Sequence, residues 1–93
     1  MLRVNRAGTD MLVYPNPAKD AFTMQIRVDR TDNAVIRIID ASGKQISTKN
    51  MVLQKGDNVI GMETYSFPAG TYIIEIKLLH GEVFRKRLQV IKG

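Results

Sequence analysis

The sequence predicts an all-β protein, an immunoglobulin-like β-sandwich of about seven short antiparallel strands. Turn-forming residues recur roughly every 10 to 14 residues, a spacing typical of sandwiches and barrels. Two segments alternate strictly between apolar and polar residues, which is the pattern of half-buried strands. No segment follows the helical period, and 93 residues suffice for one domain rather than two.

Turn signals divide the chain into segments of strand length. They are rich in Gly, Pro, Asn and Asp, which favour turns for separate stereochemical reasons. They lie at residues 15–17, 29–33, 41–43, 55–58, 67–70 and 80–81. The strands predicted between and around them are 12–14, 20–28, 34–40, 44–52, 58–63, 71–79 and 83–91.

Alternation identifies the side of each strand that faces the core. Successive side chains of a strand point to opposite faces, so every second residue shares a face. The clearest apolar sets are Phe22, Met24, Ile26 and Val28, and then Tyr72, Ile74, Ile76 and Leu78. Arg37 interrupts one face of residues 34–40, which puts Ile36 and Ile38 inside. In the two weaker strands the residues expected inside are Ile46, Met51 or Leu53, Ile60 and Met62.

Prolines and the N-terminal residues define the domain boundary. Pro15 and Pro17 lack a backbone N–H, so residues 12–17 are expected to form an edge strand or its exit. Residues 67–70 carry Pro and Gly at the positions that a type I turn favours. Residues 1–10 show neither alternation nor the apolar centre of a signal peptide. We therefore expect a linker or tail over residues 1–11 and one domain over residues 12–93.

Composition excludes several classes of function. The chain has no cysteine, so disulfides, thiol catalysis and zinc ribbons are excluded. No apolar run approaches the ~20 residues that span a membrane as a helix. The net charge is +5, yet the one dense cationic run is Arg85-Lys86-Arg87, without interleaved aromatic residues to stack on bases. A solvated basic face explains this run better than a nucleic-acid site.

Residues able to do acid–base or metal chemistry do not form a site in the sequence. His80 is the single histidine, lies in a tight turn and is expected to be a solvated tip residue. The glutamates expected to be exposed or at strand ends are Glu63, Glu75 and Glu82. Asp29 and Asp32 lack the glycine and the distal glutamate of an EF-hand loop. We therefore expect no enzymatic activity, no metal site and no cofactor.

The apolar pattern fixes the register of the last hairpin. A two-residue loop would put Phe84 opposite Lys77, whereas the three-residue loop 79–81 keeps both apolar sets on one face. The expected pairs are 78 with 82, 76 with 84, 74 with 86 and 72 with 88. Gly81 then takes the left-handed position of a bulge, and Lys86 lies on the apolar face. Because a buried unpaired ammonium is costly, either Lys86 extends past the end of the sheet with its stem packed on Ile74, or the last strand is loosely docked. We expect an edge strand whose Lys86 end stays accessible.

Three stretches, taken in order, resemble a known family. They are Tyr14-Pro15-Asn16-Pro17-Ala18, Gly70-Thr71-Tyr72 and Lys86-Arg87-Leu88-Gln89-Val90, with residues 38–44 and 56–60 between them. Together they resemble the type A C-terminal sorting domain of cargo exported by the type IX secretion system. The resemblance covers about residues 12–92, and it departs at Ile39, where the family often has an aromatic residue. The sorting-motif residues that it implies are Tyr14, Pro15, Asn16, Pro17, Gly70, Tyr72, Lys86, Leu88 and Val90.

The resemblance implies a role in protein secretion. Such domains lie at the C-terminus of precursor proteins in Gram-negative bacteria. An N-terminal signal peptide takes these precursors to the periplasm. The domain then directs its covalently attached cargo through the outer-membrane secretion machinery to the cell surface or beyond. A surface sortase-like protease commonly removes the domain and releases the cargo or joins it to an anionic lipopolysaccharide. The partners implied are the machinery, the protease and an upstream cargo domain, with no nucleic acid and no stable membrane insertion. Residues 1–11 would be the linker from the cargo, and the chain an excised piece of a longer precursor.

Structural roles and another class of function stay open beside the resemblance. The two prolines would stop edge pairing, Gly70 would satisfy its turn, and Tyr72 would fill the core, with or without a sorting role. A fibronectin-like spacer or a carbohydrate-binding sandwich of a secreted protein would have the same fold. A sugar site needs exposed aromatic rings on one face, and no such platform is evident in the sequence. The aromatic residues are Tyr14, Phe22, Tyr65, Phe67, Tyr72 and Phe84.

Overall fold

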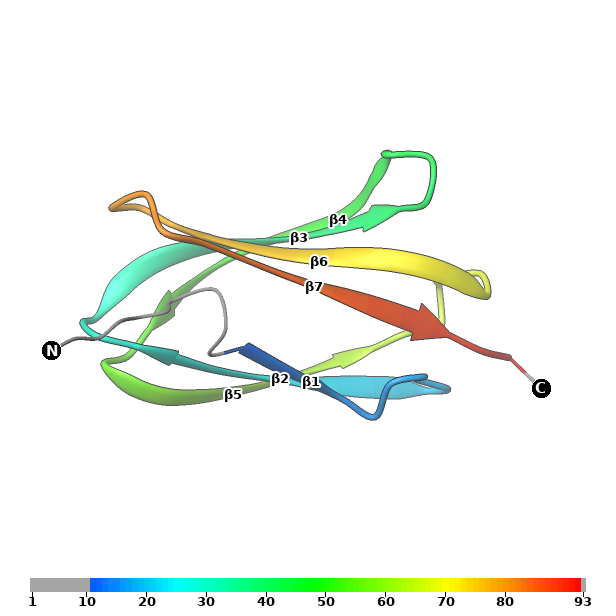
Figure 1. Ribbon diagram of the computed structural model, residues 1–93, viewed down its shortest axis with the longest axis horizontal. Coiled ribbons are helices and arrows are strands. Elements are labelled where there is room, and N and C mark those ends of the chain that lie inside the picture. Colours follow the sequence, from blue (N-terminus) through cyan, green and yellow to red (C-terminus); the bar gives the residue numbers. More distant parts are fainter. Residues whose placement is uncertain (1–10, 93) are drawn as a thin grey trace, which may run out of the picture.

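Two antiparallel sheets pack face to face in the computed structural model, which describes residues 11–92 (Figure 1). The seven strands are β1 Met11–Tyr14, β2 Ala21–Val28, β3 Asp32–Asp40, β4 Gln45–Leu53, β5 Gly56–Glu63, β6 Gly70–Leu78 and β7 Val83–Val90. The three-stranded sheet has the order β1-β2-β5 and the four-stranded sheet the order β4-β3-β6-β7. The predicted all-β, immunoglobulin-like sandwich of seven strands is confirmed. No helix long and apolar enough to cross a membrane occurs in the part of the chain that the structure describes.

Strand boundaries agree with the expected ones to within one residue, except that β3 and β5 begin two residues earlier, at Asp32 and Gly56, within the expected turns. The N-terminal strand also begins one residue earlier than expected. Met11, expected in the linker, is the first residue of β1, pairs with Ile26 and has no exposed surface. Its side chain is apolar and points inward with Val13, two residues on, because strand side chains repeat with period two. The remaining residues of the expected linker, 1–10, lie outside the described part.

The core is formed by the alternating apolar sets of both sheets. The apolar residues of β2 and β6 that the sequence puts inside are all buried, as are Ile36, Ile38, Leu53 and Ile60. Three others, Ile46, Met51 and Met62, are only partly buried and pack against the rim of the core. Their strands, β4 and β5, are the outer strands of their sheets. An outer strand has a neighbour on one side only, so its side chains keep contact with water.

The connection between β5 and β6 differs from expectation. The hydrogen-bonded turn expected over residues 67–70 lies three residues earlier, where the N–H of Phe67 donates to the carbonyl of Thr64 at 3.0 Å. Phe67 is buried, and its ring lies 5.5 Å from the ring of Tyr72. The buried Phe67 therefore holds the end of the turn against the core. Pro68 and Gly70 follow the turn and do not form it.

The β6–β7 hairpin has the predicted register. Ile76 pairs with Phe84, and Ile74 with Lys86. Gly81 has φ +114°, a conformation that side-chain-bearing residues rarely adopt, and its N–H donates to the carbonyl of Leu78. The three-residue loop with a bulge glycine is thus confirmed, and it puts the apolar residues of both strands on one face.

Candidate functional site

Strand β7 brings the three motif stretches together at one edge of the four-stranded sheet. Its inner neighbour is β6, where Gly70 pairs with Val90 and Tyr72 with Leu88. On its other side lies the segment after β1, which pairs with it through a parallel bridge between Ala18 and Val90. Residues that are more than 70 positions apart in the chain therefore meet at this edge. We call the segment 15–18 together with β7 the clamped edge.

The segment 15–18 carries the chain from one sheet to the other. Tyr14 still pairs with Thr23 of β2 in the three-stranded sheet. Pro15 and Pro17 follow, both after cis peptide bonds, and neither has an N–H to continue pairing with β2. Ala18 then pairs with β7 in the other sheet. The expectation that this stretch is the exit of an edge strand is confirmed.

Asn16 holds the segment onto β7 with its side-chain amide. Its Nδ2 donates to the carbonyl of Arg87 at 2.9 Å, and its Oδ1 accepts from the N–H of Gln89 at 2.9 Å. Ala18 continues the ladder: its N–H donates to the Gln89 carbonyl at 2.7 Å, and its carbonyl accepts from the N–H of Ile91 at 2.8 Å. The amide of Asn16 therefore takes the place of a peptide group, with one donor and one acceptor in strand register. The motif predicted Asn16, but pairing with a strand at the other end of the chain leaves no local signal in the sequence.

Tyr72 and Gly70 pair with β7 from its neighbouring strand β6. The Tyr72 ring is buried against Phe67, and its hydroxyl donates to the carbonyl of Pro68. A tyrosine that bonds back to the backbone a few residues upstream is a recurring corner device of immunoglobulin-like sandwiches. Burial, and next the charge of Asp40, raise the pKa of the Tyr72 hydroxyl. Tyr72 thus stays neutral and helps to build the edge from within.

The motif residues of β7 itself divide into buried and exposed. Leu88 and Val90 are buried, whereas Lys86 is exposed although it pairs with the buried Ile74 on the inward face. This is possible because β7 is an outer strand, where an inward side chain can reach water at the open side of the sandwich. Lys49 holds the same position on β4, the other outer strand of the sheet, opposite Ile36. Inward-pointing charges on outer strands prevent sheets from joining edge to edge, so Lys86 has a structural role as well.

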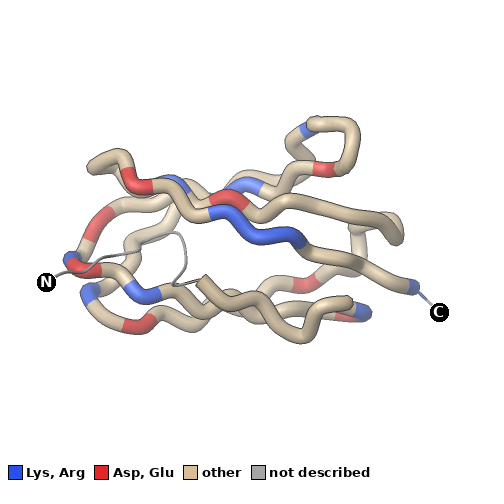
Figure 2. Tube along the Cα trace, in the orientation of Figure 1, with Lys and Arg blue, Asp and Glu red and all other residues tan. Residues whose placement is uncertain are grey.

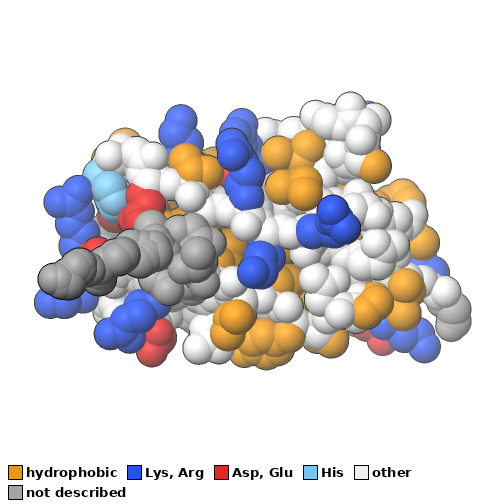
Figure 3. Space-filling view, viewed as in Figure 1, with side chains coloured by type: hydrophobic (Ala, Val, Ile, Leu, Met, Phe, Trp, Pro, Cys, Tyr) orange, Lys and Arg blue, Asp and Glu red, His pale blue; other side chains and the backbone are white. Residues whose placement is uncertain are grey.

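Basic side chains gather along β7. Figure 2 shows the continuous cationic run on this strand, and Figure 3 shows Lys and Arg side chains at the surface over the same strand. The run is Arg85, Lys86 and Arg87, all exposed. β1, which contacts β7 across the edge of the sandwich, contains no charged residue. Among residues 11–92, the carboxylate that pairs with this run is Glu75 of β6, through Arg85.

Glu75 is a correction to the sequence analysis, which expected it to be exposed. It is 4% exposed and lies on the outer face of the four-stranded sheet between Arg37 of β3 and Arg85 of β7. Nε of each arginine donates to one carboxylate oxygen, at 2.9 Å in both cases. Hydrogen bonding by Arg37, and secondly by Arg85, lowers the pKa of Glu75 against the opposing effect of burial. The glutamate is covered by its arginine partners, and the sequence could not indicate this because they lie on other strands.

Thr64 anchors the β5–β6 connection to the residues that follow the segment 15–18 and β7. Its hydroxyl donates to the carbonyl of Lys19 and its N–H to that of Asp20, both at 2.9 Å. Lys92 donates from Nζ to the carbonyl of Thr64 at 2.8 Å. The threonine is fully buried, and sequence analysis missed it because a lone threonine in a turn carries no pattern. Thr64 therefore links Lys19 and Asp20, which follow the segment 15–18, and Lys92, which follows β7, to the β5–β6 connection.

The opposite end of β7 has its own polar cluster. Nδ1 of His80 lies 2.6 Å from Asp32, and its Nε2 lies 3.3 Å from Glu82. Hydrogen bonds from the backbone and then the side chain of His80 are the main causes that lower the pKa of Asp32. His80 is exposed as expected, and in addition it ties the β6–β7 turn to the start of β3. Over residues 11–92, no three His, Cys, Asp or Glu side chains lie together in a way that could hold a metal ion.

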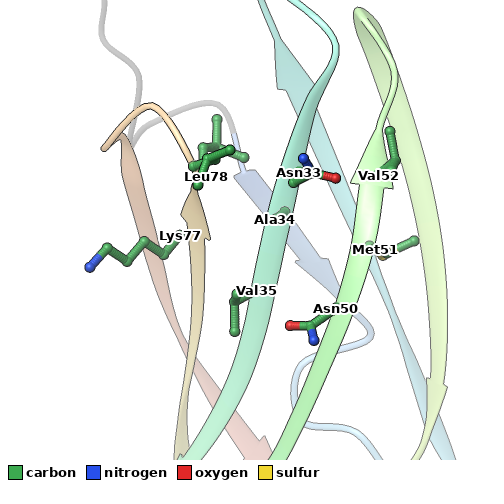
Figure 4. A pocket seen from close by; sticks show the side chains of 9 residues that line it. Asn33, Ala34, Val35, Asn50, Met51, Val52, Lys77 and Leu78 are labelled. Atoms are coloured by element: carbon green, nitrogen blue, oxygen red, sulfur yellow. The ribbon is translucent and has the colours of Figure 1, made fainter.

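A groove of about 770 Å³ lies on the outer face of the four-stranded sheet, at the end remote from the segment 15–18 (Figure 4). Val35 of β3 and Asn50 of β4 pair with each other in its floor. Its rim includes Val52 and Leu79, which are exposed. Lys77 is the one ionisable side chain that lines it. A single lysine offers no acid–base pair, so the groove has no catalytic constellation.

Aromatic residues form no sugar-binding platform. The phenylalanines and Tyr72 are buried. The two exposed rings are Tyr14, 44% exposed on β1, and Tyr65, 71% exposed in the β5–β6 connection. Because the two belong to different elements and flank no common pocket of those found, the carbohydrate-binding alternative gains no support.

The fold and the clamped edge define a class of small β-sandwich domain that carries its motif residues along its last strand. Residues 12–91 match the family described as "Secretion system C-terminal sorting domain", and the chain belongs to this family. It is a sorting signal of type IX secretion rather than a catalytic domain. It serves the export of an attached cargo across the outer membrane to the cell surface or the extracellular space.

One curated relative is an endo-acting ulvan lyase of Formosa agariphila, which is 28% identical over 83 residues. The matched segment covers 89% of this chain but 15% of the lyase. The chain therefore spans a small part of that protein, and the activity in its name is that of the lyase.

Proposed function

We propose that the secretion machinery recognises this chain as a folded surface, the clamped edge, instead of a linear C-terminal tail. The observation that carries the proposal is the pair of hydrogen bonds from Asn16 to Arg87 and Gln89. They join the first motif stretch to the last one in fixed register. A receptor that met only the extended tail would gain nothing from residues 15–17.

Burial divides the motif residues into two kinds. Tyr72, Leu88 and Val90 are buried, so in the folded chain they hold β7 in place without touching a partner. Tyr14, Pro15, Asn16, Pro17 and Lys86 are exposed, and Gly70 is half-buried. The exposed residues are therefore the ones that a partner can contact directly.

The proposal is tested by loosening the clamp in a full precursor. Asn16→Ala removes both bonds to β7 and leaves the core residues unchanged. Asn50→Ala is the matched control, because Asn50 is an exposed asparagine on an outer strand and lies on the far edge of the same sheet. We expect the fraction of cargo left in the periplasm to be at least several-fold higher for Asn16→Ala than for the control. Circular dichroism should show that the sorting domain is folded in both variants. Equal export of the two variants would overturn the proposal.

We also infer the order of events around export. The cargo, attached upstream, passes through the periplasm, and a surface sortase-like protease then separates it from the domain. Proteolysis favours segments whose cleavage breaks few backbone hydrogen bonds, and a cut after Met11 would sever the β1–β2 pairing. The cut is therefore expected within residues 1–10. N-terminal sequencing of the released domain tests this, and a new N-terminus inside residues 20–91 or upstream of Met1 would contradict it.

A further inference from the structure

We infer that the part of β7 not covered by the segment 15–18 is a docking site for an extended acidic segment of the export machinery, which adds to β7 as a further strand. The inference rests on the proposed function, because it names the kind of partner that the clamped edge receives. The site consists of residues 83–87, which we call the open edge.

The hydrogen-bonding direction of each β7 residue follows from the observed pairs. The Glu82 carbonyl accepts from Leu78 of β6, whereas the Arg87 carbonyl and both backbone groups of Gln89 bond to the segment 15–18 on the other side. In an antiparallel pair these directions alternate from one residue to the next. The even-numbered residues of β7 therefore face β6, and the odd-numbered residues direct their N–H and C=O groups outward.

Four of the nine outward groups from Val83 to the Ile91 N–H are satisfied within the described chain, and five are not. Asn16 and Ala18 bond the outward groups from the Arg87 carbonyl to the Ile91 N–H. The N–H and C=O of Val83 and Arg85 and the N–H of Arg87 have no hydrogen-bond partner among residues 11–92. A row of such groups at a sheet edge is the feature to which an extended peptide pairs. The segment 15–18 already pairs in this way with the C-terminal part of β7, from the Arg87 carbonyl onward.

Charge selects the partner. The open edge contains all of the run Arg85-Lys86-Arg87. Within the described part of the chain, the one carboxylate that contacts it is Glu75, which is shared with Arg37. β1, which flanks the edge, is uncharged. In the sequence, residues 1–10 carry two arginines and one aspartate, so by charge they complement this edge poorly. A partner strand rich in Asp or Glu would complement it.

Lys86 also rejects the wrong strands. It lies on the inward face of β7 opposite Ile74, so an added strand meets its ammonium group. An apolar strand would leave that charge unpaired, and a second copy of β7 would set like charges against one another. A carboxylate beside Lys86 would instead form an ion pair at the rim. The same residue thus guards the edge against aggregation and admits an acidic strand.

Peptide binding to the 93-residue chain tests the inference apart from export. The probe is a short synthetic peptide of alternating glutamate and valine, with a lysine-and-valine peptide as the control. Amide signals in NMR spectra report the site, and hydrogen exchange of the Arg85 and Arg87 amides reports strand pairing. We expect shifts centred on residues 83–87, amide exchange at least tenfold slower with the acidic peptide, and weaker binding at high salt.

Lys86→Glu should weaken binding of the acidic peptide at least tenfold, whereas Lys49→Glu on the other outer strand should leave it unchanged. Equal loss in both variants, shifts centred on β4, or binding of anionic phospholipid vesicles without the peptide would overturn the inference. Slow exchange of Arg85 in the free chain would also overturn it, because the edge would then already be occupied. If the peptide binds as expected while Asn16→Ala is exported normally, the docking site stands and the proposed function fails; the reverse pair of results rejects the docking site alone.

Discussion

Lys86 lowers the stability of the sandwich locally and favours recognition of its edge. Its stem lies on the apolar face opposite Ile74, and its ammonium group reaches water at the edge of the sheet. An apolar residue at this position would suit the core better. The lysine therefore limits stability locally and keeps the edge of the sheet open to a charged partner.

Replacing Lys86 by leucine is expected to separate these two roles. Lys86→Leu should keep or raise the free energy of unfolding, by up to about 1 kcal/mol, since it adds apolar surface to a face that is already apolar. Export of the cargo should fall in the same variant. Lys49→Leu, the equivalent change on β4, should have the same effect on thermal unfolding and leave export intact. A destabilised Lys86→Leu domain, or normal export, would refute the assignment.

Glu75 is expected to make stability depend on pH. Its folded pKa is lowered, chiefly by Arg37 and next by Arg85, so its contribution is complete above the unfolded pKa of about 4.3. The contribution is lost as pH falls through the lower, folded pKa, because the unfolded chain then binds more protons. Glu75→Gln should cost about 1–3 kcal/mol at pH 7 and flatten the loss of stability below pH 5. Glu63→Gln, at an exposed site, is the control, and identical pH profiles in urea unfolding would contradict this role.

At the scale of elements, the sequence predicted what is local and missed what is not. The period-two pattern and the loop length fixed the strands and the register of the last hairpin, because both depend on residues close together in the chain. The burial of Glu75 depends on β3 and β7 flanking β6. The bonds from Asn16 to β7 and the anchoring of Lys92 at Thr64 likewise depend on strand neighbours that no local pattern specifies.

The turn of the last hairpin offers a test at this scale. Gly81 has φ +114°, so Gly81→Ala should destabilise the domain by about 1–2 kcal/mol even though a methyl group has room there. Gly61, in β5, also has room for a methyl group and has no such φ. Gly61→Ala should therefore be neutral or slightly stabilising. Denaturant unfolding compares the two, and equal effects would mean that the bulge does not hold the β6–β7 register.

At the scale of the whole molecule, the first and last segments are parts of one edge. The segment 15–18 closes half of β7, and the open edge remains beside it. Removing either terminal segment would expose the core as well as change the surface. The motif residues thus act together in folding, and we expect them to act together in sorting.

Export of a reporter protein tests the central claim most directly. One precursor carries the reporter joined to the full 93-residue chain, and another carries it joined to residues 84–93 alone, behind the same signal peptide. The measurement is the fraction of the reporter outside the cell. If the sorting signal is the folded clamped edge, the full chain exports the reporter and the short tail leaves it in the periplasm. Equal export by the short tail would contradict the claim.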